Sequence, residues 1–374
     1  MDFIPVNQPL LSGNEENYLQ ECIRTEWISS QGPFVKRFEE GLASRVGRKH
    51  GVAVSSGTAA LEIAVKALGL GPGDEVIMPT FTIISCAAAV VKSGARPVLV
   101  DSDPQTWNMD HHQIESRITR NTKAIMVVHI YGLPCEMEHI LNLVDKHGLF
   151  LIEDAAEVLG QTYNEKPCGG FGDISIFSFY PNKHITTGEG GMVLTDDGLL
   201  AEKCKDLRNL CFGHERRFVH EELGWNYRMS NLQAALGVAQ LEKLDEHIKR
   251  KREIGKRYTQ LLQGLEGVQL PCEAASYSEN LYWVYGTVIE DDLELDSEKA
   301  ISLLAERKIG TRPFFWPMHE QPVFNRMGFF LRESYPVAER LARRGLYLPS
   351  GLGIREEQQE YVAIKLKEVL GDGF

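Results

Sequence analysis

The 374-residue sequence has no apolar run that approaches the roughly 20 residues needed to cross a bilayer as a helix. Its first residues, MDFIPVNQPLL, carry neither the basic stretch nor the apolar stretch of a secretion signal. Internal repeats and low-complexity segments are also lacking. We therefore expect a soluble, cytoplasmic protein that has no membrane partner.

Cysteine and positive charge are both scarce. The seven cysteines are odd in number and form no C-x-x-C pair, which argues against a disulfide framework and against a structural metal site. Buried free thiols are the expected state. Because 52 acidic residues outnumber 40 lysines and arginines, the net charge of −12 argues against a nucleic-acid partner.

Glycine-rich nucleotide-binding motifs are absent. The sequence contains no G-x-G-x-x-G and no Walker loop, and the run GLGPG at 69–73 fits neither. A dinucleotide-binding dehydrogenase would suit the strand and helix pattern described next, but it lacks its glycine fingerprint.

The sequence does contain a regular alternation of short apolar strands and helices from residue 51 onward. Strands are predicted at 51–54, 75–78, 97–100, 124–130 and 149–152. Such a pattern indicates an α/β fold whose mostly parallel sheet is covered by helices on both faces. Ligands of these sheets bind beyond the carboxyl ends of the strands, which is where Ser56, Thr80, Asp154 and Ser178 fall.

The stretch 173–192, DISIFSFYPNKHITTGEGGM, holds the strongest candidate for chemistry. Its apolar run 174–179 predicts a buried strand, and Lys183 follows directly on a turn. A lysine that is partly withdrawn from water has a lowered pKa and can form a Schiff base. An ordinary surface lysine is the simpler interpretation of Lys183 taken alone.

Two upstream features favour the functional interpretation of Lys183. Asp154 ends a wholly apolar strand, where a carboxylate is costly to bury unless it faces a cation such as the protonated pyridine nitrogen of pyridoxal 5′-phosphate. Ser56, Gly57 and Thr58 lie between a strand and a helix, which is typical of a phosphate site. The same residues would also serve as simple helix caps.

From residue 198 onward the pattern changes. One long helix is predicted from Asn231 to about Leu262, and the segments beyond it indicate a small α+β unit. We expect a large domain over residues 1–250 and a small C-terminal domain over 251–374. The loop at 27–33 either lines a pocket or simply connects two helices.

Five ordered segments resemble one protein family. They are DEVIMPTFT, FLIEDAAEVLG, GDISIFSFYPNKHITTGEGG, GWNYRMSNLQAALGVAQLEKLD and TRPFFWPMHEQP. Together they resemble the DegT/DnrJ/EryC1/StrS sugar aminotransferases over essentially the whole chain. The segments WISS and DSDPQTWNM are further similar to those of the GDP-perosamine synthases within that family.

The resemblance implies a fold type I transferase similar to aspartate aminotransferase, with a mixed, mostly parallel seven-stranded sheet and a small C-terminal domain. It also implies pyridoxal 5′-phosphate as cofactor and a homodimer with shared active sites. Lys183 would carry the cofactor and move the proton, and Asp154 would pair with the pyridine nitrogen. The other implied cofactor contacts are Ser56, Gly57, Thr58 and Ser178 at the phosphate, Ile83 over the ring, Glu157 at the ring 3-oxygen, and Asn226 from the partner subunit.

The implied substrate contacts are Arg312 and His319, together with Trp27 and Ser29. The implied reaction moves an amino group from L-glutamate to a 4-keto-6-deoxy sugar nucleotide, with GDP-4-keto-6-deoxy-D-mannose as the expected acceptor and surface polysaccharide as the destination. A UDP- or dTDP-linked acceptor stays open. A sugar dehydratase and a non-catalytic regulatory homologue are weaker alternatives, because Lys183, Asp154 and Asn226 are all intact.

Overall fold

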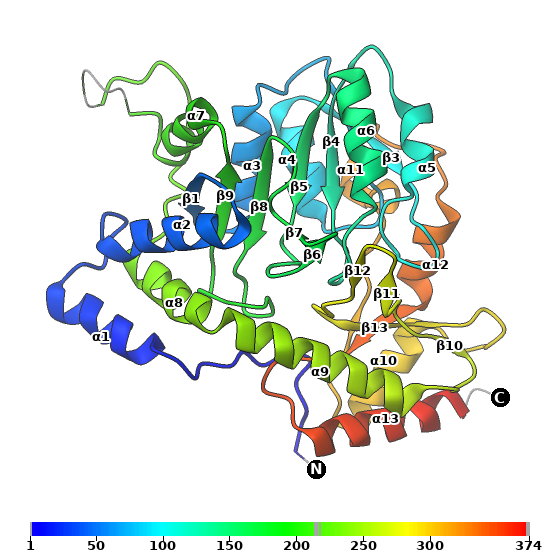
Figure 1. Ribbon diagram of the computed structural model, residues 1–374. Helices are drawn as coiled ribbons and strands as arrows, with labels where there is room; N and C mark the ends of the chain where they lie inside the picture. The colour runs from blue at the N-terminus through cyan, green and yellow to red at the C-terminus, as the bar shows by residue number, and fades with distance from the viewer. Residues whose placement is uncertain (1, 213–215, 217, 372–374) are drawn as a thin grey trace.

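The computed structural model describes residues 2–212, 216 and 218–371. Its centre is a seven-stranded sheet, which confirms the predicted α/β architecture (Figure 1). In spatial order the strands are β1 (His50–Val54), β9 (Gly191–Thr195), β8 (Ile174–Ser178), β5 (Phe150–Asp154), β4 (Thr122–Val128), β2 (Glu75–Pro79) and β3 (Arg96–Val100). Because alternate residues of each strand face opposite sides, both faces of the sheet are apolar and both carry helices.

Strand β9 gives the sheet its mixed character. It pairs antiparallel with both β8 and β1, whereas β8, β5, β4, β2 and β3 form a parallel run. The sequence analysis did not predict β9, since its residues follow the glycines of the motif around Lys183. β1 points the same way as β8 because each opposes β9, so their carboxyl ends share one edge of the sheet.

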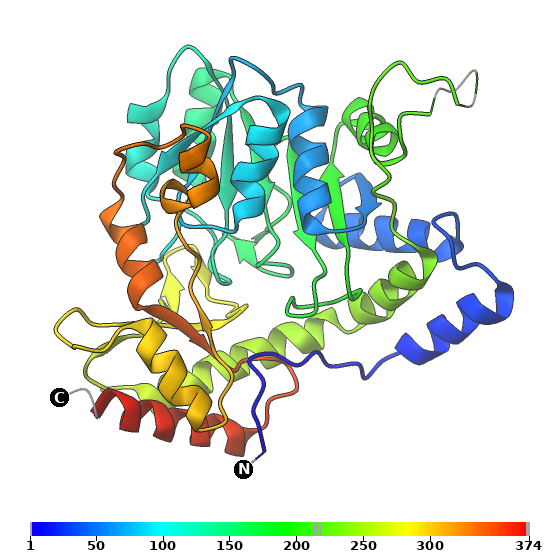
Figure 2. The same cartoon turned by 180° about the vertical axis from the view of Figure 1, so that it is seen from behind.

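Two groups of helices cover the sheet. On the face turned toward the viewer in Figure 2, α3 (Gly57–Ala67), α4 (Ile84–Ser93) and α7 (Gly198–Arg208) pack on it. The other face carries α2 (Pro33–Val46), α5 (His111–Ile114), α6 (Met137–His147) and α8 (Asn231–Glu242), and α1 (Glu15–Thr25) packs on α8.

The predicted single helix over 231–262 is wrong in one respect. The chain forms two helices, α8 and α9 (Leu244–Leu262), which share Lys243 as a junction with φ −101° and ψ 4°. No proline or glycine marks this position. The break therefore follows from tertiary packing, because α8 lies on the large sheet while α9 continues beneath it to the C-terminal layer (Figure 1).

The C-terminal layer is a small α+β unit, as predicted. Its four-stranded sheet has the order β10 (Val268–Gln269), β13 (Tyr285–Ile289), β15 (Gly345–Leu348) and β14 (Arg312–Pro313). It packs with α9, α10 (Ser297–Glu306), α12 (Pro336–Arg344) and α13 (Glu356–Gly371). The remaining short elements are β6 (Thr162–Tyr163), β7 (Lys166–Pro167), β11 (Ala274–Ala275), β12 (Ser278–Glu279), α11 (Pro322–Arg326) and the 3-10 turns at Glu115–Arg117 and Met318–Glu320.

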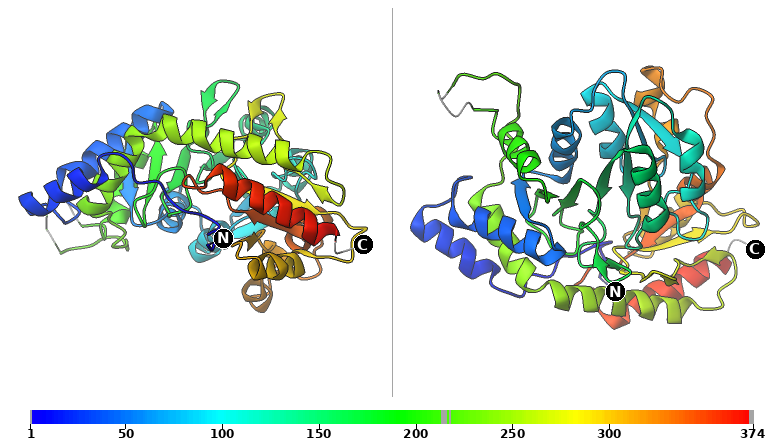
Figure 3. Two further views of the ribbon diagram at one scale, coloured as in Figure 1. Left: turned by 90° about the horizontal axis from the view of Figure 1, so that it is seen from below. Right: turned by 45° about the horizontal axis from the view of Figure 1, so that its top comes forward.

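The N-terminal segment belongs to this small layer in space. Ile4 forms a parallel bridge with Ile309 and is buried in the core of the small layer. Figure 3 shows the N-terminus beside this layer. The proposed domain boundary at residue 250 falls within α9, and we keep the division into two domains as a proposal. Within the described ranges, the helices are too short or too polar to traverse a bilayer.

The turn after β4 docks the small layer onto the large sheet. The carbonyl of Tyr131 accepts from the Trp283 amide, and the carbonyl of Gly132 accepts from the Leu281 amide. Gly132 has φ +107°, and a Cβ there would lie 2.7 Å from the backbone nitrogens of Tyr282 and Trp283. This close approach of two backbones requires glycine.

Replacing Gly132 with alanine should lower the free energy of unfolding by about 2–4 kcal/mol, because it adds a strained φ and separates the two backbones. Urea unfolding followed by circular dichroism measures the loss. The matched control is G148A, since Gly148 also has positive φ (+61°) but has open space around its Cβ position. G148A should cost only about 1–2 kcal/mol; equal losses would contradict the docking role.

Candidate active site

A cavity of about 390 Å³ opens at the carboxyl edge of the large sheet. It collects the ends of β1, β5 and β8, the first turn of α3 and the loop after β8, and the small layer closes one side. The sequence-predicted residues that line it are Ser56, Gly57, Thr58, Ile83, Asp154, Glu157, Ser178 and Lys183. The structure therefore places in one cavity eight residues that the sequence analysis expected around the cofactor.

The turn between β1 and α3 forms a small cradle. Ser56 caps α3 by accepting from the Ala59 amide at 3.1 Å, so the cap interpretation of this serine is correct and is compatible with a pocket position. Thr58 Oγ1 lies 2.8 Å from Ser85 Oγ. A Cβ on Gly57 would lie 2.8 Å from the Cβ of Ser178, so any side chain there would fill the space beside the helix end. Such a helix N-terminus suits a phosphate.

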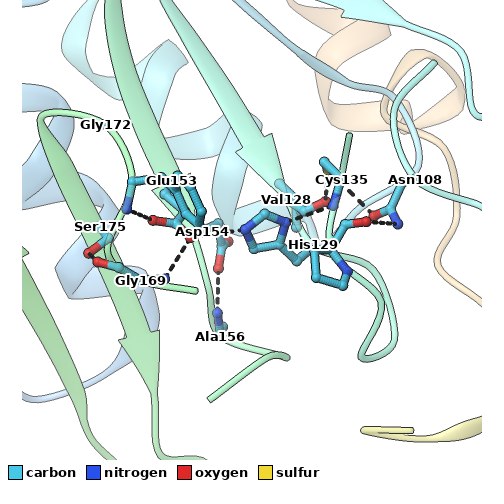
Figure 4. Close-up of polar contacts among 12 residues, drawn as sticks. Asn108, Val128, His129, Cys135, Glu153, Asp154, Ala156, Gly169, Gly172 and Ser175 are labelled. Carbon is cyan, nitrogen blue, oxygen red and sulfur yellow. Dashed lines mark hydrogen bonds and ion pairs between the residues drawn. The ribbon is translucent and has the colours of Figure 1, made fainter. Parts of the chain in front are cut away.

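Asp154 lies at the base of the cavity and is 2% exposed. Its Oδ1 accepts from the Ala156 amide at 3.1 Å (Figure 4), and its Oδ2 accepts from the Cys86 thiol at 3.2 Å. Burial raises the pKa of Asp154. A cation placed against this carboxylate would remove the cost of burying the charge.

Lys183 lies across the cavity from the α3 turn and is largely buried. Its Nζ donates to Glu157 Oε1 at 3.5 Å and lies 3.8 Å from the centroid of the Trp283 ring. Burial lowers the pKa of Lys183, and the Glu157 carboxylate partly opposes this shift. A larger share of its amine is therefore unprotonated and nucleophilic near neutral pH.

Glu157 links Lys183 to the domain-docking turn. Its Oε2 accepts from the Tyr131 amide at 2.9 Å while its Oε1 faces Lys183. Burial raises the pKa of Glu157 to about 7. A carboxyl group poised in this range can change its charge when a ligand enters the cavity.

The aromatic wall of the cavity was missed by the sequence analysis. Trp283, Phe315 and Tyr347 come from the small layer, and the indole N–H of Trp283 donates to the Asn182 carbonyl at 2.8 Å. The run YWVYG gave a signal of buried aromatic residues, but nothing in it indicates which ring faces the large sheet.

Five predicted site residues lie elsewhere in this chain. The described residues that line the cavity do not include Trp27, Ser29, Asn226, Arg312 or His319. Trp27, Ser29 and Asn226 are exposed. Arg312 is exposed too, but it pairs across the small sheet with Tyr347, which does line the cavity.

His319 is buried outside the cavity. Its Nδ1 lies 2.9 Å from Thr80 Oγ1 and its Nε2 lies 3.0 Å from Glu339 Oε1, so both ring nitrogens have partners. These contacts fix the segment after Phe315 against the end of β2. The assignment of these five residues to cofactor or substrate stays a prediction.

Comparison with known proteins identifies the family. The DegT/DnrJ/EryC1/StrS aminotransferase family matches residues 9–367. The chain belongs to this family. It is 42% identical over 372 residues to a protein of Escherichia coli O157:H7 named GDP-perosamine synthase, and the match covers all of both chains.

Solved structures agree with this family assignment. The aminotransferase TlmJ from Streptoalloteichus hindustanus matches with a TM-score of 0.91 and 30% identity, over 99% of each chain. Spr1654 from Streptococcus pneumoniae, in its pyridoxal 5′-phosphate form, matches with a TM-score of 0.93 and 25% identity over 100% of each chain. The protein is a sugar aminotransferase that depends on pyridoxal 5′-phosphate, with a fold type I architecture.

The cavity fits this cofactor. It offers a glycine cradle at a helix N-terminus for the phosphate, a buried carboxylate for the pyridine nitrogen and a nucleophilic lysine for the aldehyde. Ile83, which is 42% exposed, lies at the cavity wall. Its place over the cofactor ring stays a prediction.

Replacing Glu157 with glutamine should shift the pH dependence of cofactor capture by Lys183. Removing the carboxylate removes an interaction that raises the pKa of Lys183. The unprotonated amine then persists to lower pH. The rate at which the cofactor-free protein combines with pyridoxal 5′-phosphate, followed by absorbance from pH 6 to about 10, gives the midpoint.

The matched control is E189Q, because Glu189 lines the same cavity as an exposed carboxylate and, within the described part of the chain, makes no hydrogen bond or ion pair with Lys183. E189Q should leave the midpoint in place. An unmoved midpoint in E157Q, or equal shifts in both variants, would contradict the pairing of Glu157 with Lys183.

Proposed function

We propose that this protein transfers the amino group of L-glutamate to C4 of GDP-4-keto-6-deoxy-D-mannose and so forms GDP-perosamine. The observation that carries the proposal is the full-length identity of 42% to a protein named GDP-perosamine synthase, in a chain with an intact Lys183 site. Proteins of that name from Caulobacter vibrioides and Vibrio cholerae are 42% and 39% identical over nearly the whole chain. The product would serve O-antigen and lipopolysaccharide synthesis in the cytoplasm.

The chain's own residues divide the work of this reaction. When bound, pyridoxal 5′-phosphate supplies the electron sink for carbanion chemistry. Asp154 would hold the proton on the pyridine nitrogen, and Ser56, Gly57, Thr58 and Ser178 would hold the phosphate. The amine of Lys183 would hold the aldehyde end of the cofactor and would move the proton at the reacting carbon. Asp154 and Lys183 would be the catalytic residues, and Glu157 would lie beside the ring 3-oxygen.

The small layer would keep water away from these steps. The rings of Trp283 and Phe315 cover the side of the cavity that the large sheet leaves open. Exclusion of water strengthens the interaction of Asp154 with the pyridine nitrogen and prevents loss of reactive species. Arg312, His319, Trp27 and Ser29 remain our proposed contacts to the sugar nucleotide.

We further propose that the active unit is a homodimer with shared sites. Asn226 is exposed in the single chain, where it forms a bridge with Asn209, while its neighbour Trp225 packs against the core of the large layer. In a dimer Asn226 would reach the phosphate in the partner's cavity. This arrangement would explain why an asparagine in a family motif stands apart from the cavity of its own chain.

Mixing two defective variants tests the shared site. K183A should lose turnover by a factor of roughly 10²–10⁴ or more while the fold persists, since no other amine replaces Lys183. N226A should also be weak. If sites are shared, a 1:1 mixture of the two refolded together should recover about a quarter of wild-type activity, because half of the dimers then contain one intact site.

The control for K183A is K249A, because Lys249 is a solvent-exposed lysine on α9. K249A should keep full activity. Absence of recovery in the mixture would contradict the shared site, and full turnover by K183A would contradict the role of Lys183.

A panel of keto sugar nucleotides tests the substrate. With L-glutamate, GDP-4-keto-6-deoxy-D-mannose should be aminated with a kcat/KM about 100-fold or more above that of a UDP-linked keto sugar, as measured by product mass. K183A protein serves as the blank. A preference for UDP-N-acetyl-3-dehydroglucosamine would instead favour the activity named for a relative that is 38% identical over 92% of this chain.

A further inference from the structure

Cys86 lies directly behind the catalytic carboxylate. It is the third residue of α4, it is fully buried, and its Sγ is 3.2 Å from Asp154 Oδ2. The other oxygen of Asp154 is held by the Ala156 amide. Thr82, also buried, places its Oγ1 3.5 Å from the same sulfur. Each carboxylate oxygen of Asp154 thus has one donor, and Thr82 contacts the sulfur that serves one of them.

The chemistry of these groups fixes the direction of the hydrogen bonds. An ionised carboxylate can only accept, so the thiol donates its proton to Asp154. The hydroxyl of Thr82 then donates to the sulfur, since the thiol proton is already engaged. Burial raises the pKa of the Cys86 thiol well above its usual value, which keeps the sulfur protonated. The result is an ordered relay from Thr82 through Cys86 to Asp154.

The other thiols of the chain differ from Cys86 in their partners. Those with a hydrogen bond in the described part of the chain, Cys22, Cys135 and Cys272, bond carbonyl or amide groups. Cys204 is equally buried among apolar side chains of α7. Among the hydrogen bonds of these thiols in the described part of the chain, the bond to the Asp154 carboxylate sets Cys86 apart.

We propose that Cys86 is a positioning residue for the transamination reaction, acting by donating its thiol proton to Asp154. The proposal rests on the role assigned above to Asp154 at the pyridine nitrogen. The thiol fixes the rotation of the carboxylate and engages one oxygen, so that the remaining lone pairs face the cofactor. Because S–H is a weak donor, it orients Asp154 without greatly weakening it as a base for the pyridine proton.

The first test observes the hydrogen bond itself and needs no cofactor. Infrared difference spectra of cofactor-free protein, wild type minus C86A, isolate the S–H stretch of Cys86. Wild type minus C204A gives the same band for a thiol in an apolar setting. The Cys86 band should lie at lower frequency than the Cys204 band and should move in D154N. Coincident bands, or a Cys86 band that ignores D154N, would overturn the proposal.

The second test compares serine with alanine at each of two positions. A net hydrogen bond of this kind is equivalent to about a 2- to 10-fold change in affinity, so C86A should raise the dissociation constant of pyridoxal 5′-phosphate by about that factor. C86S should restore it to within about twofold, since its hydroxyl donates to Asp154 as well. At Cys204 neither variant should alter cofactor affinity, and C204S should be less stable than C204A because it buries a hydroxyl.

These experiments distinguish a failure of the proposed role of Cys86 from a failure of the proposed role of Asp154. If C86A and C86S bind the cofactor equally well, the positioning role of Cys86 is wrong while the role of Asp154 stands. If D154N itself retains wild-type turnover, the role assigned to Asp154 is wrong. A reduction of kcat in C86A that C86S rescues, at unchanged KM for L-glutamate, supports positioning of the catalytic carboxylate.

Discussion

The structure of this protein depends on how it offsets the cost of burying three ionisable groups at one edge of the large sheet. Asp154, Glu157 and Lys183 share a cavity, and each has a pKa displaced by burial. The charged form of each group is costly to bury, and protein groups satisfy these charges only in part. Backbone amides of Ala156 and Tyr131 serve one oxygen of each carboxylate. The cavity is therefore matched to a ligand that brings a cation to Asp154, which is what a protonated pyridine does.

The need to bury these ionisable groups also explains why the small C-terminal layer meets the large sheet at the cavity. Lys183 faces a ring of the small layer, and Trp283 is fixed by its own backbone contacts. Its carbonyl accepts from Lys251 Nζ at 2.8 Å, and Lys251 also donates to the Ser350 carbonyl at 2.7 Å. Burial lowers the pKa of Lys251 to about 7. Two carbonyl acceptors offset the cost of burying Lys251. Its hydrogen bonds connect α9 to the segments around Trp283 and Ser350 and help to hold the Trp283 ring beside Lys183.

The sequence reveals those parts of the site that depend on local order. Ser56, Asp154, Ser178 and Lys183 each lie at or shortly after the end of a strand, and a parallel sheet brings the carboxyl ends of its strands to one edge. Contacts between segments that are distant in the sequence leave no comparable pattern in the sequence. The contact of Cys86 with Asp154 depends on how α4 packs on the sheet. The helix break at Lys243 arises because α8 packs on the large sheet whereas α9 packs on the C-terminal layer. The contacts of His319 with Thr80 and Glu339 outside the cavity likewise join segments far apart in the chain, and no local pattern indicates them.

The adjacent acids Glu153 and Asp154 on β5 have different roles, because successive side chains of a strand face opposite sides of the sheet. Asp154 faces the cavity, whereas Glu153 faces the other side of the sheet, where its carboxylate accepts from the amides of Gly169 and Phe171 and contacts His129 Nε2 at 3.0 Å (Figure 4). His129 Nδ1 accepts from the Cys135 amide, so the ring proton sits on Nε2 and points at Glu153. Glu153 is thus saturated by three donors and cannot compete for the cofactor. The hydrogen bonds of Glu153 connect β5 to His129 at the end of β4 and to the 169–171 turn. Glu153 therefore helps to fix the strand that carries Asp154. These bonds explain how two neighbouring buried carboxylates can both be stable.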